Sequence, residues 1–293
     1  RLALIVADDP DEPAKLPDGE DGPAKPIVTT RLQFKDDDSG YLDDKRSHLR
    51  LFELATKKDV LLTPGQHDEW SPAFSPDGKT IAFATKRGAD PDRHLNSDIW
   101  LVEARAGGKE RQLTTFEGAD LDPYWESQLA WSPDGTQIAY LQGGDDKWAD
   151  YAPWQLAVVD VASGKSRVPA NLDRCMSRPK WSADGKGVLV LLEESRVTYL
   201  SRIEVSTGKL EQLTHGNRFD YNFDTRAGTT VVLTGEGDTP NEIYALDGAN
   251  LRALTKQNEA LRAEVDFRPL ADFSVTTADG TRVDGLLMTP FGY

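Results

Sequence analysis

The residues able to do chemistry in this chain are few and scattered. Its four histidines (His48, His67, His94 and His215) lack the spacing of a metal-binding motif, so each is expected to be structural or solvated. The single cysteine, Cys175, rules out an intrachain disulfide and a thiolate zinc site. The 293 residues contain no G-x-S-x-G motif, the strained turn that presents a nucleophilic serine. The sequence therefore predicts no catalytic residue, metal site or cofactor site within this chain.

Two short motifs resemble ligand-binding loops without completing them. Residues 36–40 read Asp-Asp-Asp-Ser-Gly, but a calcium loop does not have Gly at its fifth position and needs Glu where Ser47 stands. Residues 164–166 read Gly-Lys-Ser, the end of a P-loop, but Val159 occupies the place of the first glycine. Neither calcium nor nucleotide binding is predicted.

Composition narrows the class of partner. The formal net charge of -15 repels phosphate backbones and anionic lipid, which argues against nucleic acid or a membrane surface as a partner. No apolar run approaches the roughly 20 residues that span a bilayer. Hydrophobic residues make up 38% of the chain, with 7 Trp, 8 Tyr and 10 Phe, so a folded globular protein is expected. The sequence does not decide between a cytoplasmic and a periplasmic location.

A repeated turn reveals the elements that must position any site. Ser-Pro-Asp-Gly or a close variant recurs roughly every 40 to 60 residues, at 75–78, 132–135, 182–185 and, in degenerate form, 225–228. Proline fixes φ, aspartate bonds to its own backbone two residues on, and glycine supplies a positive φ, so each copy closes a tight hairpin. An aromatic residue precedes the turn in the first three copies and should wedge between repeats.

Each repeat continues with two more short β-prone runs, the last of which usually ends in Leu-Thr. Four strands per repeat predict an all-β fold, a β-propeller of four-stranded blades. About five blades are expected, at residues 1–63 (partial), 68–114, 128–169, 177–214 and 220–255. The first lacks an innermost strand, which predicts an open arc of a seven- or eight-bladed propeller that begins inside a blade.

Two segments depart from the repeat. Residues 8–26 are rich in Asp, Glu, Pro and Gly and are expected to form a solvated acidic insertion within the first blade. Residues 264–293 contain two alternating strands around an Asp-Gly turn and have a different pattern from the blades. The expected division is therefore a propeller at 1–263 and the start of another domain at 264–293.

Four charged residues stand just before predicted innermost strands, where side chains tend to lie near the central channel or at a propeller face. They are Glu126, Arg178, Arg218 and Asp220. An inter-blade salt bridge or an exposed loop charge is the alternative role for each of them.

The blades, followed directly by Phe-Ser-Val-Thr-Thr-Ala-Asp-Gly-Thr-Arg-Val-Asp-Gly-Leu-Leu-Met-Thr-Pro at 273–290, resemble the prolyl oligopeptidase family of serine peptidases. The likeness is greatest to its acylaminoacyl peptidase and dipeptidyl aminopeptidase branches. It implies that the hairpin leads into an α/β-hydrolase domain, with Ser, Asp and His all beyond Tyr293. It also implies that propeller charges such as Glu126, Arg178, Arg218 and Asp220 anchor a peptide end.

The resemblance implies a non-catalytic propeller that gates the access of short peptides to a hydrolase active site. The expected partners are peptide substrates and that hydrolase domain; self-association of the full-length protein is left open. The alternative is a propeller that only binds other proteins, similar to the periplasmic propeller of the Tol system, because the repeated turn also occurs there.

Overall fold

The computed structural model describes residues 1–8, 28–37, 40–42, 45–121, 127–148, 151–237, 239–268 and 270–292. The expected acidic insertion lies outside these residues except for Asp8. No helix in the described part of the chain has the length and apolar character needed to cross a membrane. The chain divides into two compact units, residues 1–124 with 142–152 and residues 125–141 with 153–293.

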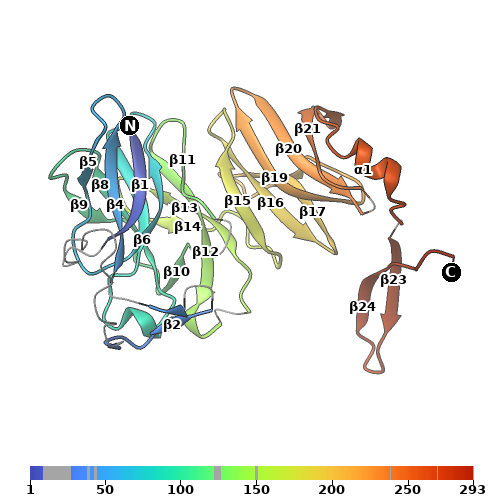
Figure 1. The fold of residues 1–293 in the computed structure, drawn as a ribbon, viewed down its shortest axis with the longest axis horizontal. Helices are drawn as coiled ribbons and strands as arrows, with labels where there is room; N and C mark the ends of the chain where they lie inside the picture. The colour runs from blue at the N-terminus through green and yellow to red at the C-terminus, as the bar shows by residue number, and fades with distance from the viewer. Residues whose placement is uncertain are drawn as a thin grey trace, which may run out of the picture. The chain divides into compact units, whose positions relative to one another are not determined.

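The first unit holds one incomplete blade and one complete blade (Figure 1). A three-stranded antiparallel sheet has the order β1 (Leu2–Asp8), β4 (Arg46–Glu53), β5 (Lys58–Leu61). The next sheet has four strands: β6 (Glu69–Phe74), β7 (Thr80–Thr85), β8 (Asp98–Glu103) and β9 (Glu110–Gln112). Short elements complete the unit: β2 (Lys35–Asp36), β3 (Gly40–Tyr41), η1 (Pro91–Arg93), β10 (Gly118–Asp120) and η2 (Asp146–Trp148). Among the described residues, the first blade thus contributes three strands to its sheet.

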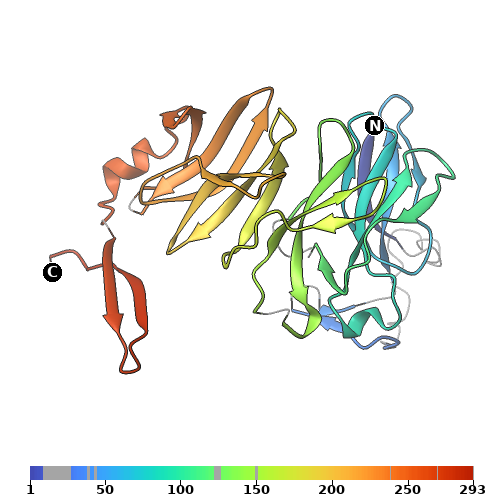
Figure 2. The ribbon, with the colours of Figure 1, turned by 180° about the vertical axis from the view of Figure 1, so that it is seen from behind.

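The second unit contains the later blades (Figure 2). Its first sheet contains β11 (Ala130–Trp131), β12 (Gln137–Asp145), β13 (Gln155–Asp160) and β14 (Ser166–Arg167). The next strands are β15 (Met176–Trp181), β16 (Gly187–Glu194), β17 (Val197–Glu204) and β18 (Leu210–Gln212). They are followed by β19 (Arg218–Arg226), β20 (Thr229–Glu236), β21 (Glu242–Asp247) and β22 (Asn250–Ala253). The all-β fold of propeller blades is confirmed.

The innermost strand of the third blade differs from the prediction. We expected one strand from about residue 128, but β10 and β11 both pair with β12, one near each end. The end of β12 that pairs with β10, through Asp120 and Gln142, belongs to the first unit. Local sequence patterns could not predict this pairing, because β10 has only three residues and carries no turn motif.

The Ser-Pro-Asp-Gly turns form as their chemistry predicts. In the first, the Ser75 hydroxyl donates to Asp77 Oδ1 at 2.7 Å, and the same oxygen accepts from Lys79 N at 3.0 Å. Thr80 N donates back to Ser75 Oγ at 3.0 Å, and Gly78 takes a φ of 69° that favours glycine. The turns at 132–135 and 182–185 repeat these bonds. Each turn therefore fixes the register of its two strands.

Apolar side chains fill the space between neighbouring sheets within each unit. In the first unit, Leu49 and Leu51 pack against Ile81, Phe83 and Val102. In the second unit, a cluster around Leu156 and Val190 includes the wedge predicted before the third turn, Trp181, whose Nε1 donates to Ala130 O at 2.8 Å. These interfaces give the charged residues at the strand ends a rigid frame.

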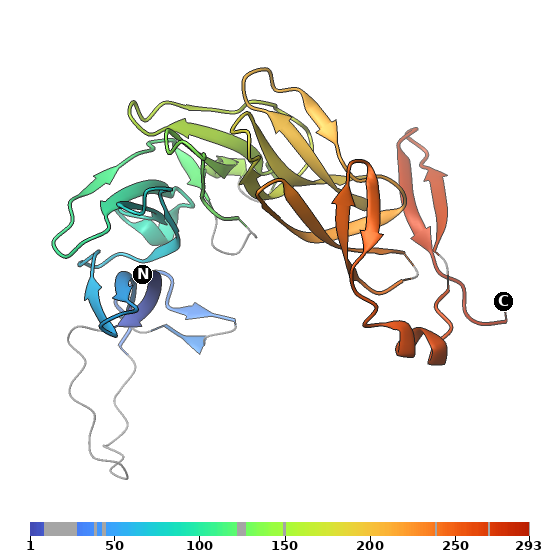
Figure 3. The ribbon, with the colours of Figure 1, turned by 90° about the horizontal axis from the view of Figure 1, so that it is seen from above.

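The chain continues through a short helix that we did not anticipate, α1 (Glu259–Glu264), to the hairpin of β23 (Ala271–Thr276) and β24 (Arg282–Leu287), shown from above in Figure 3. Residues that face each other across an antiparallel pair share one side of the sheet. One side therefore carries Phe273, Val275, Val283 and Leu287, all at least 43% exposed. The hairpin has an uncovered apolar side.

Candidate functional site

The structure brings two of the four predicted site residues together at the start of β19. The Arg218 side chain is 11% exposed and that of Asp220 is fully buried, with Arg218 Nε 3.6 Å from Asp220 Oδ1. Arg218 also lies 3.6 Å from Glu236 Oε1 and donates to Thr234 Oγ1 at 3.3 Å. The guanidinium charge is thus shared between two carboxylates of its own blade.

The other oxygen of Asp220 binds the neighbouring blade. Asp220 Oδ2 accepts from Leu200 N at 2.9 Å and from the Thr214 hydroxyl, whose oxygen also accepts from Leu200 N at 2.9 Å. The carboxylate therefore ties the start of β19 to β17 across a blade boundary. This is the geometry of an inter-blade contact, and the peptide-anchoring role of Arg218 and Asp220 stays a prediction.

The same arrangement recurs in the first unit, where sequence reasoning missed it. Thr63 Oγ1 accepts from Leu49 N at 2.9 Å and donates to Glu69 Oε2 at 2.9 Å. Thr114 Oγ1 accepts from Ile99 N at 2.8 Å. A buried acid stands six positions after each threonine, in the pairs Thr63 and Glu69, Thr114 and Asp120, and Thr214 and Asp220. In the second pair the threonine instead bonds Asp98 of its own blade, and Asp120 Oδ1 accepts from Gln142 Nε2 at 2.9 Å. We call the bonded arrangement, in Thr63–Glu69 and Thr214–Asp220, the threonine–acid latch; its Leu-Thr-x5-Asp/Glu spacing was visible in the sequence.

Glu69 sits in a fuller charged cluster than Asp220. Arg87 Nη2 contacts Glu69 Oε1 at 3.0 Å and Glu110 Oε2 at 2.6 Å, and its guanidinium lies 4.3 Å from the Trp100 ring centroid. His48, which lies within β4, places Nδ1 3.3 Å from Glu69 Oε2. Burial raises the pKa of Glu69, while the Thr63 and Arg87 contacts oppose that rise. Both carboxylate oxygens of Glu69 therefore have partners within the cluster.

Arg178 occupies an irregular position in its strand. Arg178 lies at a β-bulge in β15, between the pairs Ser177–Leu191 and Lys180–Leu189, and takes a left-handed φ of 55°. Ser71, also followed by proline, takes the same conformation in the bulge of β6. Glu126 lies outside the described residues. The pair shown together among the predicted site residues is Arg218 and Asp220.

Asp98, at the start of β8, has a carboxyl group with a strongly raised pKa. Burial raises its pKa to about 6, against partial compensation by hydrogen bonds from Gln112 and Thr114. Gln112 Nε2 donates to Asp98 Oδ2 at 2.9 Å, whereas Oδ1 is buried and receives no hydrogen bond from the described residues. An acid whose pKa is higher in the folded state makes the free energy of unfolding fall as pH rises from its unfolded to its folded pKa.

We therefore expect Asp98 to cost about 1–2 kcal/mol of stability between about pH 4 and pH 7, after allowance for its partial exposure. Urea unfolding followed by circular dichroism at several pH values should show this loss in the parent chain and not in Asp98→Asn. Asp224→Asn is a control that should change the pH dependence in the opposite direction. The Lys180 hydrogen bond lowers the pKa of Asp224, so this carboxylate adds stability as the pH rises. Equal pH dependence in the parent and Asp98→Asn would contradict the assignment.

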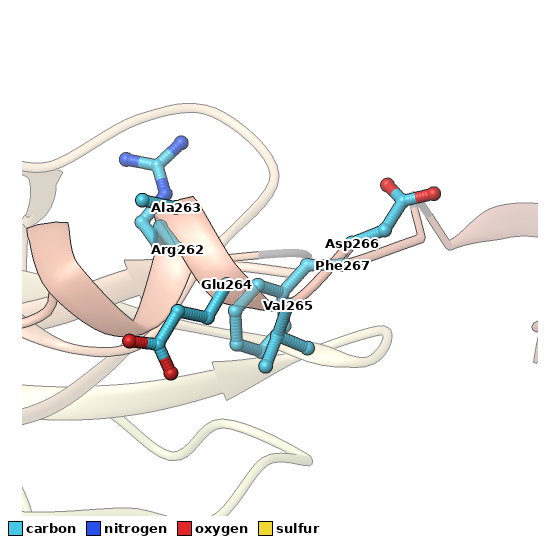
Figure 4. A pocket seen from close by; sticks show the side chains of 6 residues that line it. All are labelled: Arg262, Ala263, Glu264, Val265, Asp266 and Phe267. Carbon is cyan, nitrogen blue, oxygen red and sulfur yellow. The ribbon is translucent and has the colours of Figure 1, made fainter.

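An open depression of about 430 Å³ lies at the end of α1, lined by Arg262, Ala263, Glu264, Val265, Asp266 and Phe267. Its charged side chains point in different directions rather than toward a common point (Figure 4). Within the described part of the chain, no three His, Cys, Asp or Glu side chains are grouped so that they could hold a metal ion. The depression therefore does not bring catalytic groups together.

The repeated runs of antiparallel strands joined by short turns, the chemistry of those turns and the threonine–acid latch define a β-propeller domain. The TolB beta propeller domain matches residues 39–218, more than half of the chain. The chain belongs to this family of propeller domains.

The curated relatives are peptidases. This chain is 28% identical to dipeptidyl-peptidase 5 of Porphyromonas gingivalis over 194 residues. The match covers 64% of this chain and 27% of that protein. Dipeptidyl-peptidase 5 of Trichophyton equinum is 30% identical over 240 residues, covering 75% of this chain and 32% of the relative. The chain thus spans about a third or less of these relatives. The resemblance to the propeller portion of prolyl oligopeptidase family enzymes is confirmed.

Solved structures show the same fold. An acylaminoacyl peptidase from Pyrococcus horikoshii aligns with a TM-score of 0.67 at 16% identity, covering 90% of this chain and 39% of that one. A putative TolB from Agrobacterium tumefaciens aligns with a TM-score of 0.54 at 20% identity, covering 72% of this chain and 75% of that one. Propellers of both peptidases and Tol proteins therefore share this architecture.

Proposed function

We propose that this chain is the non-catalytic propeller of a serine peptidase, and that it limits access to a hydrolase active site to short peptides. The observation that carries the proposal is the sequence match to dipeptidyl-peptidases over 240 residues. In this proposal the bond cleavage uses a Ser, His and Asp constellation in a domain that follows residue 293. The propeller contributes exclusion of large substrates rather than chemistry.

The hairpin β23–β24 supports a following domain. Its apolar side, with Phe273, Val275, Val283 and Leu287, is exposed in this chain, and two-stranded hairpins are at best marginally stable alone in water. Packing against a catalytic domain would cover this side. The division at residue 264 remains part of the proposal, as do peptide ends anchored by Glu126, Arg178, Arg218 or Asp220.

The full-length protein should hydrolyse dipeptide p-nitroanilides and react with a serine-directed fluorophosphonate probe. The 293-residue chain should do neither, because it contains no G-x-S-x-G nucleophile turn. The control is the full-length protein with the serine of its own G-x-S-x-G motif changed to alanine, which should lose both signals. Labelling of the present chain at a specific serine would contradict the proposal.

A protein-binding propeller is the second candidate, favoured by the match to the TolB beta propeller domain and by the 75% coverage of a TolB structure. It predicts a full-length protein that is inert toward the probe and the p-nitroanilides. Failure of hydrolysis together with a stable protein complex on affinity capture would replace the first proposal with this one.

A further inference from the structure

The turn between β16 and β17 has an unusual backbone for its sequence. Ser195 and Arg196 take φ values of 36° and 75°, and the flanking residues Glu194 and Val197 pair directly. Two-residue hairpin turns with positive φ at both positions strongly prefer Asn-Gly or Asp-Gly, because other side chains crowd the backbone there. A serine and an arginine at these positions call for a reason outside the turn.

The Arg196 side chain supplies that reason by reaching the hairpin β23–β24. Its Nη1 contacts Asp272 Oδ1 at 2.5 Å and donates to Gly285 O at 2.8 Å. The Arg196 side chain is 28% exposed although it stands at the tip of a turn. One guanidinium thus bridges both strands of the hairpin, binding a side chain of β23 and the backbone of β24.

A second contact lies just before the hairpin. A Cβ added to Gly237, in the loop after β20, would lie 3.1 Å from Leu270 Cδ1, so Leu270 packs closely on this glycine. The hairpin therefore meets the blades at a close apolar contact and at the Arg196 ion pair. We call the contacts of Arg196 with the hairpin the arginine latch.

The arginine latch also determines which side of the hairpin stays exposed. Asp272 pairs with Leu286 and alternates with Ala271 and Phe273, so its side chain lies on the opposite side from Phe273 and Val275. Arg196 thus holds the hairpin by its more polar side. The apolar side stays uncovered.

We infer that Arg196 is a positioning residue that holds β23–β24 on the β16–β17 turn with the apolar side presented outward. The contact is reversible, because an ion pair with a 75% exposed carboxylate is weak and is screened by salt. The inference concerns this chain alone and does not depend on peptidase activity.

Hydrogen exchange measured by mass spectrometry on the intact 293-residue chain tests the arginine latch. Arg196→Ala should speed exchange of the amides in 271–287 by about two- to five-fold at low salt, as expected for loss of an exposed ion pair. The parent chain should approach the variant's rate in 0.5 M NaCl. Asp272→Ala should act like Arg196→Ala, and the double variant should add little to either.

Three controls separate the arginine latch from general destabilisation. Arg252→Ala removes an ion pair of 2.7 Å to Asp247 that does not involve the hairpin, and it should leave exchange in 271–287 unchanged. Ser195→Gly relieves the turn while keeping the arginine, and should also leave it unchanged. Arg196→Lys should lie between the parent and Arg196→Ala. Unchanged exchange in Arg196→Ala, or additive effects in the double variant, would overturn the inference.

Discussion

Replacing Trp181 with alanine should lower the free energy of unfolding by about 3–5 kcal/mol, the largest effect of any single change considered. The Trp181 side chain is only 8% exposed and packs with Met176 and Val188 in the apolar cluster of the second unit. Alanine would leave a cavity and would strand Ala130 O without its donor. Urea unfolding followed by circular dichroism measures the loss.

Two further variants locate the source of this effect. Trp181→Phe keeps most of the apolar contact and removes the bond to Ala130 O, so it should cost about 1 kcal/mol beyond any packing change. Trp148→Ala removes a tryptophan that is 55% exposed and should change stability by less than about 0.5 kcal/mol. If Trp181→Ala lowers the free energy of unfolding by less than about 1.5 kcal/mol, the Trp181 side chain does not hold the neighbouring blades together.

Replacing Asp220 with alanine should cost about 2–4 kcal/mol, because Leu200 N and Thr214 lose a buried charged acceptor and Arg218 loses a counter-charge. The same unfolding measurement applies. Asp224→Ala is the matched control: it removes an aspartate of the same strand that is 69% exposed and pairs with Lys180, and should cost less than about 1 kcal/mol.

The Asp220 variant also separates the two roles considered for this residue. If the carboxylate anchors a peptide end, the full-length protein with Asp220→Ala should show a raised KM with nearly unchanged stability. If it is an inter-blade contact, stability should fall as stated, and the KM of the remaining folded protein should change little. The burial of Asp220 and its three protein contacts favour the second outcome.

Local chemistry made most of the blades predictable from the sequence. The Ser-Pro-Asp-Gly turns carry their own hydrogen bonds, and the strands on either side follow from them. The split between β10 and β11, by contrast, depends on how a three-residue strand pairs with β12, which no local pattern records. The helix α1 is short, with no buried residue, and gives correspondingly little periodic signal.

The candidate site was harder to predict because its contacts join residues that are far apart in the sequence. Placing Arg218 and Asp220 before an innermost strand followed from the repeat, but their bonding depends on Leu200, twenty residues earlier in a different blade. Glu69 could not be predicted alone, because a single acid in a strand gives no signal. Its signal is the six-residue spacing from Thr63, which recurs between Thr214 and Asp220.

The threonine–acid latch has a direction along the chain. The amide of Leu49 and the hydroxyl of Thr63 are synthesised before Glu69, the carboxylate that completes their bonds, and Leu200 and Thr214 likewise precede Asp220. In the last blade Thr255 instead donates to Glu242 of its own sheet. As the chain leaves the ribosome, a latched boundary therefore cannot close before the first strand of the following blade has emerged.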